Sequence, residues 1–177
     1  GVSIMQIEAA MDTGPVFARS ETAITEQDDA LTLSERLSVL GARTLMETLP
    51  LIDEGRIRPE PQDHARATYA PMLTREEGEI DWTQDLDTIR NMIRGLVPWP
   101  CAYTFLNGKM LKILQAVCEP GETGHPPGTL FKDRTGVRIA CTGGSIVPQR
   151  LQVEGKKAVA CDAFSCGLKT NRAILGR

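Results

Sequence analysis

Hydrophobic positions near the N-terminus predict two strands followed by a helix. Residues 2–7 are apolar and β-branched, as is typical of a strand, and residues 16–24 predict a second strand. Gly14 and Pro15 favour a turn between them. Leucines then recur at a spacing that predicts one buried helix face. They are Leu33, Leu37, Leu40, Leu45 and Leu49. A strand, turn, strand and helix in this order indicate the tail of an α/β domain.

The expected bounds of this helix follow from local chemistry. Residues 32–35 match a capping box, which predicts that Thr32 caps the helix N-terminus. Pro50 is expected to kink or end the helix, because proline removes a backbone hydrogen bond and clashes with the preceding turn. Gly55 marks the latest position at which the helix can stop.

The middle of the chain lacks a clear hydrophobic period. Residues 56–73 carry several prolines and alternating charges, which predicts a linker. Residues 74–77 predict a short helix with its own capping box. Asp85 is expected to cap a further helix that runs through Ile93, and Pro98 is expected to end it.

The remainder of the chain is predicted to be rich in strands. Residues 102–106 and 110–117 flank Asn107 and Gly108, a strong signal for a β-hairpin. Further strands are expected at 128–132, 137–141 and 145–153, with a short helix near 161–166. Several short strands at this spacing indicate a small barrel or sandwich.

Charge is divided unevenly between the two halves of the chain. Residues 1–82 contain 7 Lys and Arg against 16 Asp and Glu, a balance of −9, whereas residues 83–177 contain 13 against 7, a balance of +6. The basic half either binds a polyanion such as RNA or is a solvated surface of uneven charge. Its candidate phosphate-binding residues are Arg94, Arg150, Lys156, Lys157, Lys169 and Arg172.

Trp99 lies between two prolines in this basic half. An exposed tryptophan can stack on a nucleic-acid base. Such a tryptophan more often packs in the core, and core packing is the expectation here.

Metal, disulfide and membrane chemistry are not indicated. The five cysteines are odd in number and match no common zinc spacing, so inert thiols in a reducing compartment are expected. His64 and His125 are expected to be exposed loop residues. No stretch reaches the roughly 18 apolar residues of a membrane helix. The start lacks a Met and a basic n-region, so it is expected to be a chain cut in mid-strand and not a signal peptide.

Asp12 is the main candidate for chemistry. It follows a strand, where α/β proteins often place reactive groups, but Asp before a glycine-containing turn is more often a turn residue. The sequence has no dinucleotide-binding or phosphate-binding glycine loop, no nucleophile elbow and no His-Glu-x-x-His motif.

Five strings in register change this picture, because together they resemble the methionyl-tRNA formyltransferase family. They are Gly-Val-Ser-Ile-Met-Gln at 1–6 with Met-Asp-Thr-Gly at 11–14; Thr-Tyr-Ala-Pro at 68–71 with Glu-Glu at 76–77 and Ile-Asp-Trp at 80–82; Ile-Arg at 93–94 with Pro-Trp-Pro at 98–100; Pro-Gly-Thr at 127–129; and Gly-Lys-Lys at 155–157. Each string alone is weak evidence, but their order and spacing match across nearly the whole chain.

The resemblance implies a fold and a domain organisation. Residues 1–57 would be the tail of a Rossmann-like formyltransferase domain, residues 58–82 an interdomain linker, and residues 83–177 a C-terminal β-barrel resembling an OB fold. The rest of the catalytic domain and an insertion that clamps tRNA would lie outside this chain.

The resemblance also implies an activity. The family moves a formyl group from 10-formyltetrahydrofolate to the amino group of methionine on initiator tRNA, in the cytoplasm and without a metal, and the full-length protein would be a monomer. Of the family's Asn, His and Asp around the formyl carbon, only the Asp has a match here, Asp12. Ala10, Met11 and Asp12 would line the folate pocket. Arg94, Arg150, Lys156, Lys157 and Arg172 would bind tRNA. The fragment alone is expected to be inactive.

Two departures and two alternatives accompany the resemblance. Met72 replaces a Lys that is usual in the family, and Ala160 replaces a Ser that would cap the last helix, at a cost of about 1 kcal/mol. The alternatives are a stand-alone RNA-binding module of OB type and a formyltransferase acting on an amino-sugar nucleotide.

Overall fold

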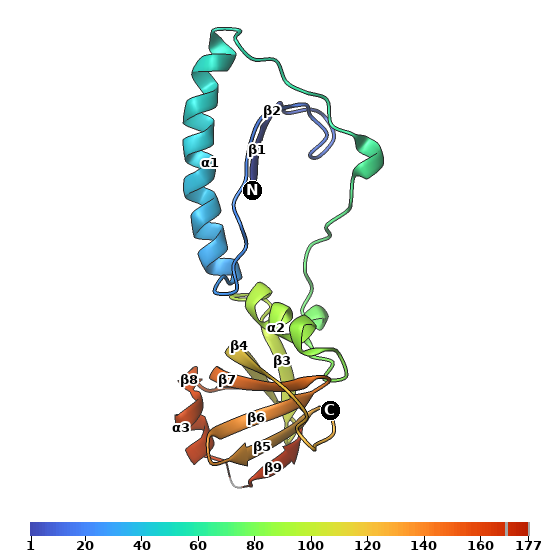
Figure 1. Ribbon diagram of the computed structural model, residues 1–177, viewed down its shortest axis with the longest axis vertical. Coiled ribbons are helices and arrows are strands. Elements are labelled where there is room, and N and C mark those ends of the chain that lie inside the picture. Colours follow the sequence, from blue (N-terminus) through green and yellow to red (C-terminus); the bar gives the residue numbers. More distant parts are fainter. Residues whose placement is uncertain (169, 177) are drawn as a thin grey trace. The chain divides into compact units, whose positions relative to one another are not determined.

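The computed structural model describes residues 1–168 and 170–176, so Lys169 lies outside the described residues. Its contacts divide the chain into two compact units, residues 1–72 and residues 73–177 (Figure 1). Each unit has its own secondary structure and is described separately below.

The first unit contains a β-hairpin packed on a long helix. Strand β1 (Val2–Met5) pairs antiparallel with β2 (Val16–Ser20), and both strands contact helix α1 (Ala30–Asp53). The strands are where the hydrophobic pattern predicts them, but they end earlier than predicted at Ile7 and Ile24. This antiparallel pairing does not by itself identify a Rossmann-like sheet.

Helix α1 begins before the predicted position. Asp29, and not Thr32, is the N-cap: the Thr32 backbone N–H donates to the Asp29 carboxylate over 2.8 Å, and the Asp29 N–H donates to Thr32 Oγ1 over 3.0 Å. The predicted cap at Thr32 is therefore wrong, because Thr32 occupies the third helical position of a box that starts at Asp29. Residues 29–32 and residues 32–35 could each form a capping box, and the box at residues 29–32 is the one that forms.

Two further features of α1 differ from the sequence pattern. Pro50 lies inside the helix, which continues to Asp53 before Gly55 adopts a positive φ of 65°. The buried positions are Thr44 and Thr48, whereas Leu45 and Leu49 are exposed. Leu33, Leu37 and Leu40 are half-buried on the helix side that continues to Thr44 and Thr48. The predicted face is therefore confirmed for its first three leucines and wrong for Leu45 and Leu49.

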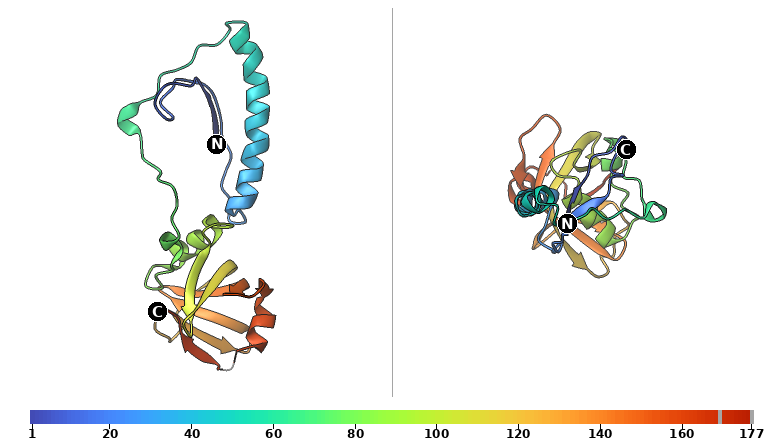
Figure 2. Two further views of the ribbon diagram at one scale, coloured as in Figure 1. Left: turned by 180° about the vertical axis from the view of Figure 1, so that it is seen from behind. Right: turned by 90° about the horizontal axis from the view of Figure 1, so that it is seen from above.

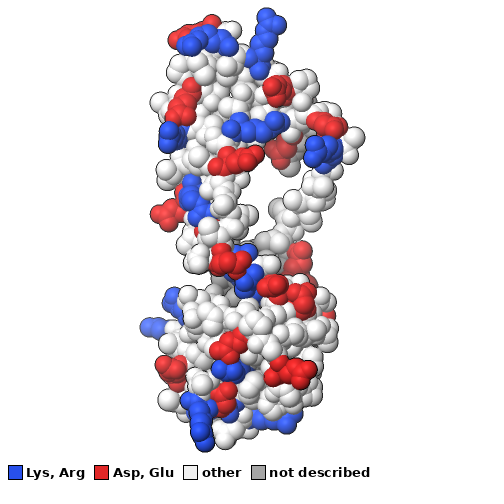
Figure 3. Space-filling view, in the orientation of Figure 1, with Lys and Arg blue, Asp and Glu red and all other residues white. Residues whose placement is uncertain are grey.

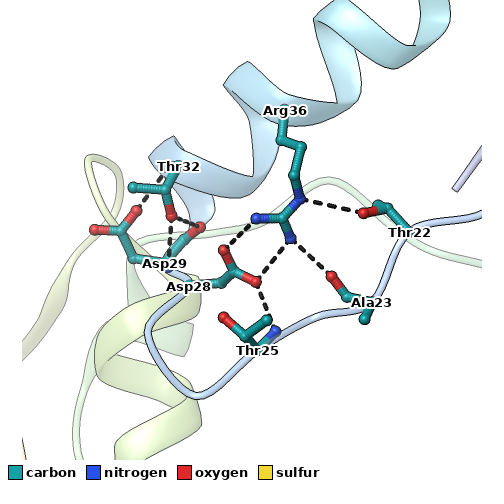
Figure 4. A network of polar contacts seen from close by, with 7 residues as sticks. All are labelled: Thr22, Ala23, Thr25, Asp28, Asp29, Thr32 and Arg36. Atoms are coloured by element: carbon teal, nitrogen blue, oxygen red, sulfur yellow. Dashed lines mark hydrogen bonds and ion pairs between the residues drawn. The ribbon is translucent and has the colours of Figure 1, made fainter.

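An ion pair connects the start of α1 to the loop after β2 (Figure 4). The Arg36 guanidinium donates to both carboxylate oxygens of Asp28 over 2.7 Å and to the Ala23 carbonyl over 2.7 Å. The Thr25 N–H also donates to Asp28, which is 6% exposed. Bidentate pairs of this kind are the stronger class of ionic hydrogen bond. The Arg36 hydrogen bond lowers the pKa of the Asp28 carboxyl well below its ordinary value.

The segment predicted as a linker is shared between the two units. Glu60 forms an isolated antiparallel bridge with Val16, so the early part of the segment belongs to the first unit. Ile80 and Trp82 are buried in the core of the second unit. Contacts divide the chain between residues 72 and 73, because the apolar residues after this point complete the second core. Two short 3-10 helices lie along this segment, His64–Arg66 and Glu76–Gly78.

The second unit is built on one curled antiparallel sheet (Figures 1 and 2). In the described part of the chain the strand order is β3-β4-β7-β6-β5-β9, with β8 paired to β7. The strands are β3 (Ala102–Leu106), β4 (Lys109–Pro120), β5 (Thr129–Asp133), β6 (Gly136–Cys141), β7 (Gly144–Val153), β8 (Val159–Ala160) and β9 (Arg172–Ile174). The Gly176 N–H donates to the Phe105 carbonyl of β3 over 3.0 Å, which brings the two ends of the sheet together. The domain is therefore barrel-like.

Local signals in this unit are confirmed by the structure. Asn107 and Gly108 both have positive φ in the β3–β4 hairpin, as this turn requires. Helix α2 (Leu86–Gly95) has Asp85 as its N-cap, and helix α3 (Cys161–Cys166) follows Ala160. Ala160 provides no side-chain cap, in agreement with the expected missing hydroxyl. Strands β8 and β9 were not predicted, because each is only two or three residues long.

Helix α2 packs against β4 and β7 and closes one side of the core. The indole N–H of Trp82 donates to Thr104 Oγ1 over 3.2 Å, which satisfies a polar atom that burial would otherwise leave unpaired. The fully buried side chains of this core come mainly from the strands. They include Ile89, Leu111, Ile113, Leu130, Ile139, Ile146 and Leu151.

The cysteines and histidines differ in their exposure. All five cysteines lie within the described ranges and are free thiols, and burial raises the pKa of the Cys141 thiol to about 11. His125 is only partly exposed, because its ring packs on Phe131 with centroids 4.4 Å apart. Among residues 1–168 and 170–176, no group of three or more potential ligands is placed to hold a metal ion. No helix of the described chain is long and apolar enough to cross a bilayer.

Candidate functional site

Asp12 lies in the loop that joins β1 to β2. Its side chain is exposed and its backbone is left-handed, with a φ of 56°. The Thr13 hydroxyl donates to the Ala10 carbonyl over 3.1 Å, which closes a short turn around Asp12. A left-handed backbone is uncommon for non-glycine residues, and Asp is among the types that adopt it most readily, usually in turns.

Gly14 fixes the far side of this loop. It is buried, and a Cβ atom there would overlap the carbonyl group of Gln6. The Gln6 N–H donates to the Pro15 carbonyl over 2.9 Å, so the two arms of the loop are joined directly below Asp12. Any side chain at Gly14 would force these arms apart.

Gln62 contacts the loop from a distant part of the chain. Its side-chain N–H groups donate to the carbonyl oxygens of Asp12 over 2.8 Å and Gly14 over 2.7 Å. The backbone bridge between Val16 and Glu60 brings this segment alongside the loop. Gln62 was not identified from the sequence, because it lies in a segment with the composition of a linker.

The loop presents both apolar and polar groups to solvent. Ala10 and Met11 are exposed beside Asp12, and Met11 and Ile7 are each almost 90% exposed, at 87% and 89%. An exposed apolar side chain next to a carboxylate suits a flat heterocycle that stacks on one face and forms hydrogen bonds at its edge. The carboxylate of Asp12 can accept a proton from a group bound beside it.

The basic candidates of the second unit are distributed over several elements. Arg94 lies in the last turn of α2, Arg150 on β7 and Arg172 on β9. Lys156 and Lys157 lie in the turn between β7 and β8. The two lysines are adjacent in sequence and line one pocket, and the three arginines are not among the residues that line it.

The two lysines line a pocket of about 580 Å³ in the second unit. Lys109, from the β3–β4 hairpin, lines the same pocket and was not among the candidates. Its apolar lining comes partly from Leu111 and Phe164. An apolar floor with ammonium groups suits an anionic ligand that carries a flat apolar part.

Trp99 is 52% exposed, so the expectation that it packs in the core is wrong. It lies in the loop after α2, where Pro98 and Pro100 restrict the backbone. The buried tryptophan of this unit is Trp82. The exposed indole is available to stack on a flat group.

Charge alone does not define a binding face. On the face drawn in Figure 3, acidic and basic side chains are interspersed over both units. Several basic residues are already paired, among them Arg138 with Glu119 over 2.6 Å. The excess of positive charge in the second half of the sequence therefore does not form one continuous basic surface in this view.

Comparison with protein families identifies the second unit. The family described as "Formyl transferase, C-terminal domain" matches residues 72–169, just over half of the chain. This match covers α2, the strands up to β8 and α3, which are the elements of the barrel-like unit.

Comparison with curated proteins extends the similarity over both units. The methionyl-tRNA formyltransferase of Geotalea uraniireducens is 43% identical over 178 residues, which cover 100% of this chain and 56% of that protein. The methionyl-tRNA formyltransferase of Caldanaerobacter subterraneus is 40% identical over 94% of this chain and 54% of its own length. The chain thus spans about half the length of the curated relatives it matches.

Solved structures show the same fold at lower identity. HypX from Aquifex aeolicus in complex with tetrahydrofolic acid has a TM-score of 0.67 and 20% identity, over 92% of this chain and 29% of that chain. Methionyl-tRNA formyltransferase from Clostridium thermocellum has a TM-score of 0.50 and 21% identity, over 68% of this chain and 51% of that chain.

Proposed function

This chain belongs to the formyl transferase C-terminal domain family, and from that premise we propose that its full-length protein formylates methionyl-initiator tRNA. The observation that carries the proposal is the match of about 40% identity to methionyl-tRNA formyltransferases over both units, including the Asp12 loop. The formyl donor we propose is 10-formyltetrahydrofolate, used without a metal.

Asp12 is the proposed catalytic carboxylate of this reaction. In formyl transfer the methionine amino nitrogen bonds to the formyl carbon and loses a proton, while the bond between that carbon and the donor nitrogen breaks and the donor nitrogen takes up a proton. A carboxylate close to the methionine nitrogen can accept the proton or orient the group that accepts it, which contributes typically 10²- to 10⁴-fold to a rate. The exposure of Asp12 and its restrained backbone are consistent with this role.

Ala10, Met11 and Asp12 are the proposed folate-binding residues. 10-Formyltetrahydrofolate supplies the electrophilic formyl carbon when it is bound. The loop fits such a group through the exposed apolar surface of Met11 beside the exposed Asp12 carboxylate. HypX, which has a similar fold, was solved in complex with tetrahydrofolic acid, and this supports a folate ligand.

The first unit is the proposed tail of a Rossmann-like catalytic domain, ending near residue 57, followed by a linker and the barrel. Its exposed apolar side chains, such as Val39 and Met46, support a larger domain around it. We infer that these 177 residues alone do not transfer formyl groups, because the family's Asn and His have no match in them.

The test of the catalytic role is Asp12→Asn in the full-length protein. Formylation of methionyl-tRNA with 10-formyltetrahydrofolate should fall in kcat by about 10²- to 10⁴-fold, because the amide cannot accept the proton. Asp53→Asn, at the exposed end of α1, is the matched control and should keep its activity. Full activity of Asp12→Asn would refute the catalytic assignment.

Lys156 and Lys157 are the centre of the proposed tRNA-binding surface, with Arg94, Arg150 and Arg172 as further contacts. Two adjacent ammonium groups beside a pocket can hold neighbouring phosphates. Replacing both lysines by Ala should weaken tRNA binding and reduce the slope of log affinity against log salt by about 1 to 2. An unchanged slope in a filter-binding titration would show that these lysines are not part of the tRNA-binding surface.

The two alternative functions are not favoured. A stand-alone RNA-binding module does not account for the similarity over the first unit. The curated relatives are named methionyl-tRNA formyltransferases, which favours methionyl-tRNA over an amino-sugar nucleotide. The proposed setting of the full-length protein is a monomer in the cytoplasm, where initiator tRNA is used.

A further inference from the structure

We propose that Gln62 is a positioning residue that holds the Asp12 loop in its reactive conformation. The proposal rests on the proposed function, because it gives a role to a residue that acts through Asp12. Nothing in the sequence pattern marks Gln62, and its role follows from two hydrogen bonds that span 50 and 48 residues of sequence.

The first step is the register of the segment. Val16 and Glu60 form an antiparallel bridge with reciprocal N–H to carbonyl bonds of 2.8 and 2.9 Å. Antiparallel pairing places residues two positions away on each strand opposite one another, so Gln62 lies opposite Gly14. The backbone pairing therefore places the Gln62 side chain beside the Asp12 loop.

The second step is the chemistry of the amide. Gln62 has one NH₂ group with two donors, and its two partners are both backbone carbonyls, of Asp12 at 2.8 Å and Gly14 at 2.7 Å. Only the NH₂ end of the amide can satisfy two acceptors. One side chain thus uses both donors to join two carbonyls of the same loop.

The third step is what these bonds fix. Asp12 has a left-handed backbone that few non-glycine residues adopt. Holding the carbonyls of Asp12 and Gly14 orients the peptide planes that follow Asp12 and restricts the directions its carboxylate can take. A misplacement of about 1 Å in a reacting group can cost about 10²-fold in rate.

No side chain of the loop replaces this restraint. The Thr13 hydroxyl bonds back to the Ala10 carbonyl and so closes the turn without holding the Asp12 carbonyl. Gly14 allows the close approach to Gln6 but supplies no side chain. Gln62 is the contact that joins the turn to the rest of the first unit.

The test is Gln62→Glu in the full-length protein. This change keeps the size of the side chain but places a carboxylate against two carbonyl oxygens, so both hydrogen bonds are lost. The expected result is a fall in kcat of about 10- to 100-fold with KM for methionyl-tRNA unchanged. Hydrogen exchange of residues 8–16, followed by mass spectrometry, should become faster.

Gln27→Glu is the matched control, because it makes the same change at an exposed position in the loop before α1. It should alter neither kcat nor exchange. Gln62→Asn is the second variant: its amide is one methylene too short to reach both carbonyls, and it should give a smaller effect in the same direction. Equal melting temperatures of these variants would separate positioning from general instability.

The outcomes distinguish this proposal from the proposed function. If the hydrogen exchange of residues 8–16 is the same in Gln62→Glu and Gln27→Glu, Gln62 does not hold the Asp12 loop, and the proposal is refuted whatever the activity. If exchange rises in Gln62→Glu while its kcat stays unchanged, and Asp12→Asn is inactive, then Gln62 holds the loop but does not position the carboxylate. This result also refutes the proposal. If Asp12→Asn is active, the catalytic assignment fails, and exchange alone then decides whether Gln62 holds the loop.

Discussion

At the level of single residues, the Asp12 loop is held by contacts from three directions. Gly14 permits a close approach to Gln6, Thr13 closes the turn, and Gln62 holds two carbonyls. Of these, the sequence indicated the turn residues, because glycine and proline have local signatures. Gln62 has no such signature, because its role depends on a backbone bridge to a strand far earlier in the chain.

Ala160 offers a prediction at the same level. It is the N-cap of α3, with an extended backbone that suits a capping side chain but without an oxygen to provide one. Ala160→Ser should stabilise the protein by about 0.5 to 1 kcal/mol, measured by urea unfolding.

Ala163→Ser is the control for this change, because it adds the same hydroxyl inside α3 instead of at its cap. It should give no gain, since serine is a weaker helix former than alanine. A gain of equal size from both variants would mean that capping is not the cause.

At the level of elements, α1 follows its leucine pattern in its first half and departs from it in its second half. Leu33, Leu37 and Leu40 are half-buried. The same side of the helix then continues through the buried Thr44 and Thr48, and Thr44 donates to Ser20 Oγ of β2 over 2.8 Å. The hairpin lies against the threonine side of the helix. Leu45 and Leu49 are left exposed, which hydrophobic periodicity alone does not predict.

The ion pair between Asp28 and Arg36 makes the attachment of α1 dependent on pH. Arg36 lowers the pKa of Asp28 in the folded protein. A lowered folded pKa contributes stability that is complete above the unfolded pKa, about 3.9, and is lost as pH falls toward the folded value. The melting temperature, measured by circular dichroism, should therefore decrease as the pH is lowered below about 4.

Asp28→Asn should lower the melting temperature at pH 7 and weaken its dependence on pH below about 4. Glu21→Gln, an exposed carboxylate in the same loop, is the control and should keep the wild-type profile. An acid profile of Asp28→Asn identical to that of wild type would show that another group is responsible.

At the level of the whole molecule, the chain consists of two units with different degrees of closure. The second unit closes its sheet through the bond between Gly176 and Phe105 and covers its core with α2. The first unit leaves Val39 and Met46 exposed. This difference fits a family in which the barrel-like domain is a complete structural module.

Residues 73–177 should therefore fold without the rest of the chain. The core from Ile80 to Leu175 lies within this range, so separation at residue 72 removes none of its members. A cooperative thermal transition and dispersed amide resonances in solution are the expected results.

The same measurements on residues 83–177, which lack Ile80 and Trp82, should show a less stable domain, by about 2 kcal/mol or more. Equal stability would place the boundary at residue 82.

The sequence by itself determined the features that depend on neighbouring residues. The Asn107-Gly108 hairpin, the Asp85 cap and the strands of the second unit follow from turn chemistry, capping and periodicity. The five strings in register indicated the family, which the comparisons confirm.

Only the tertiary structure decided the features that depend on distant residues. It exposed Trp99, buried Trp82 and brought Gln62 to the Asp12 loop. The physical reason is the range of the interaction: a local pattern fixes which conformations a segment favours. The packing of segments some 50 residues apart fixes which of them is used.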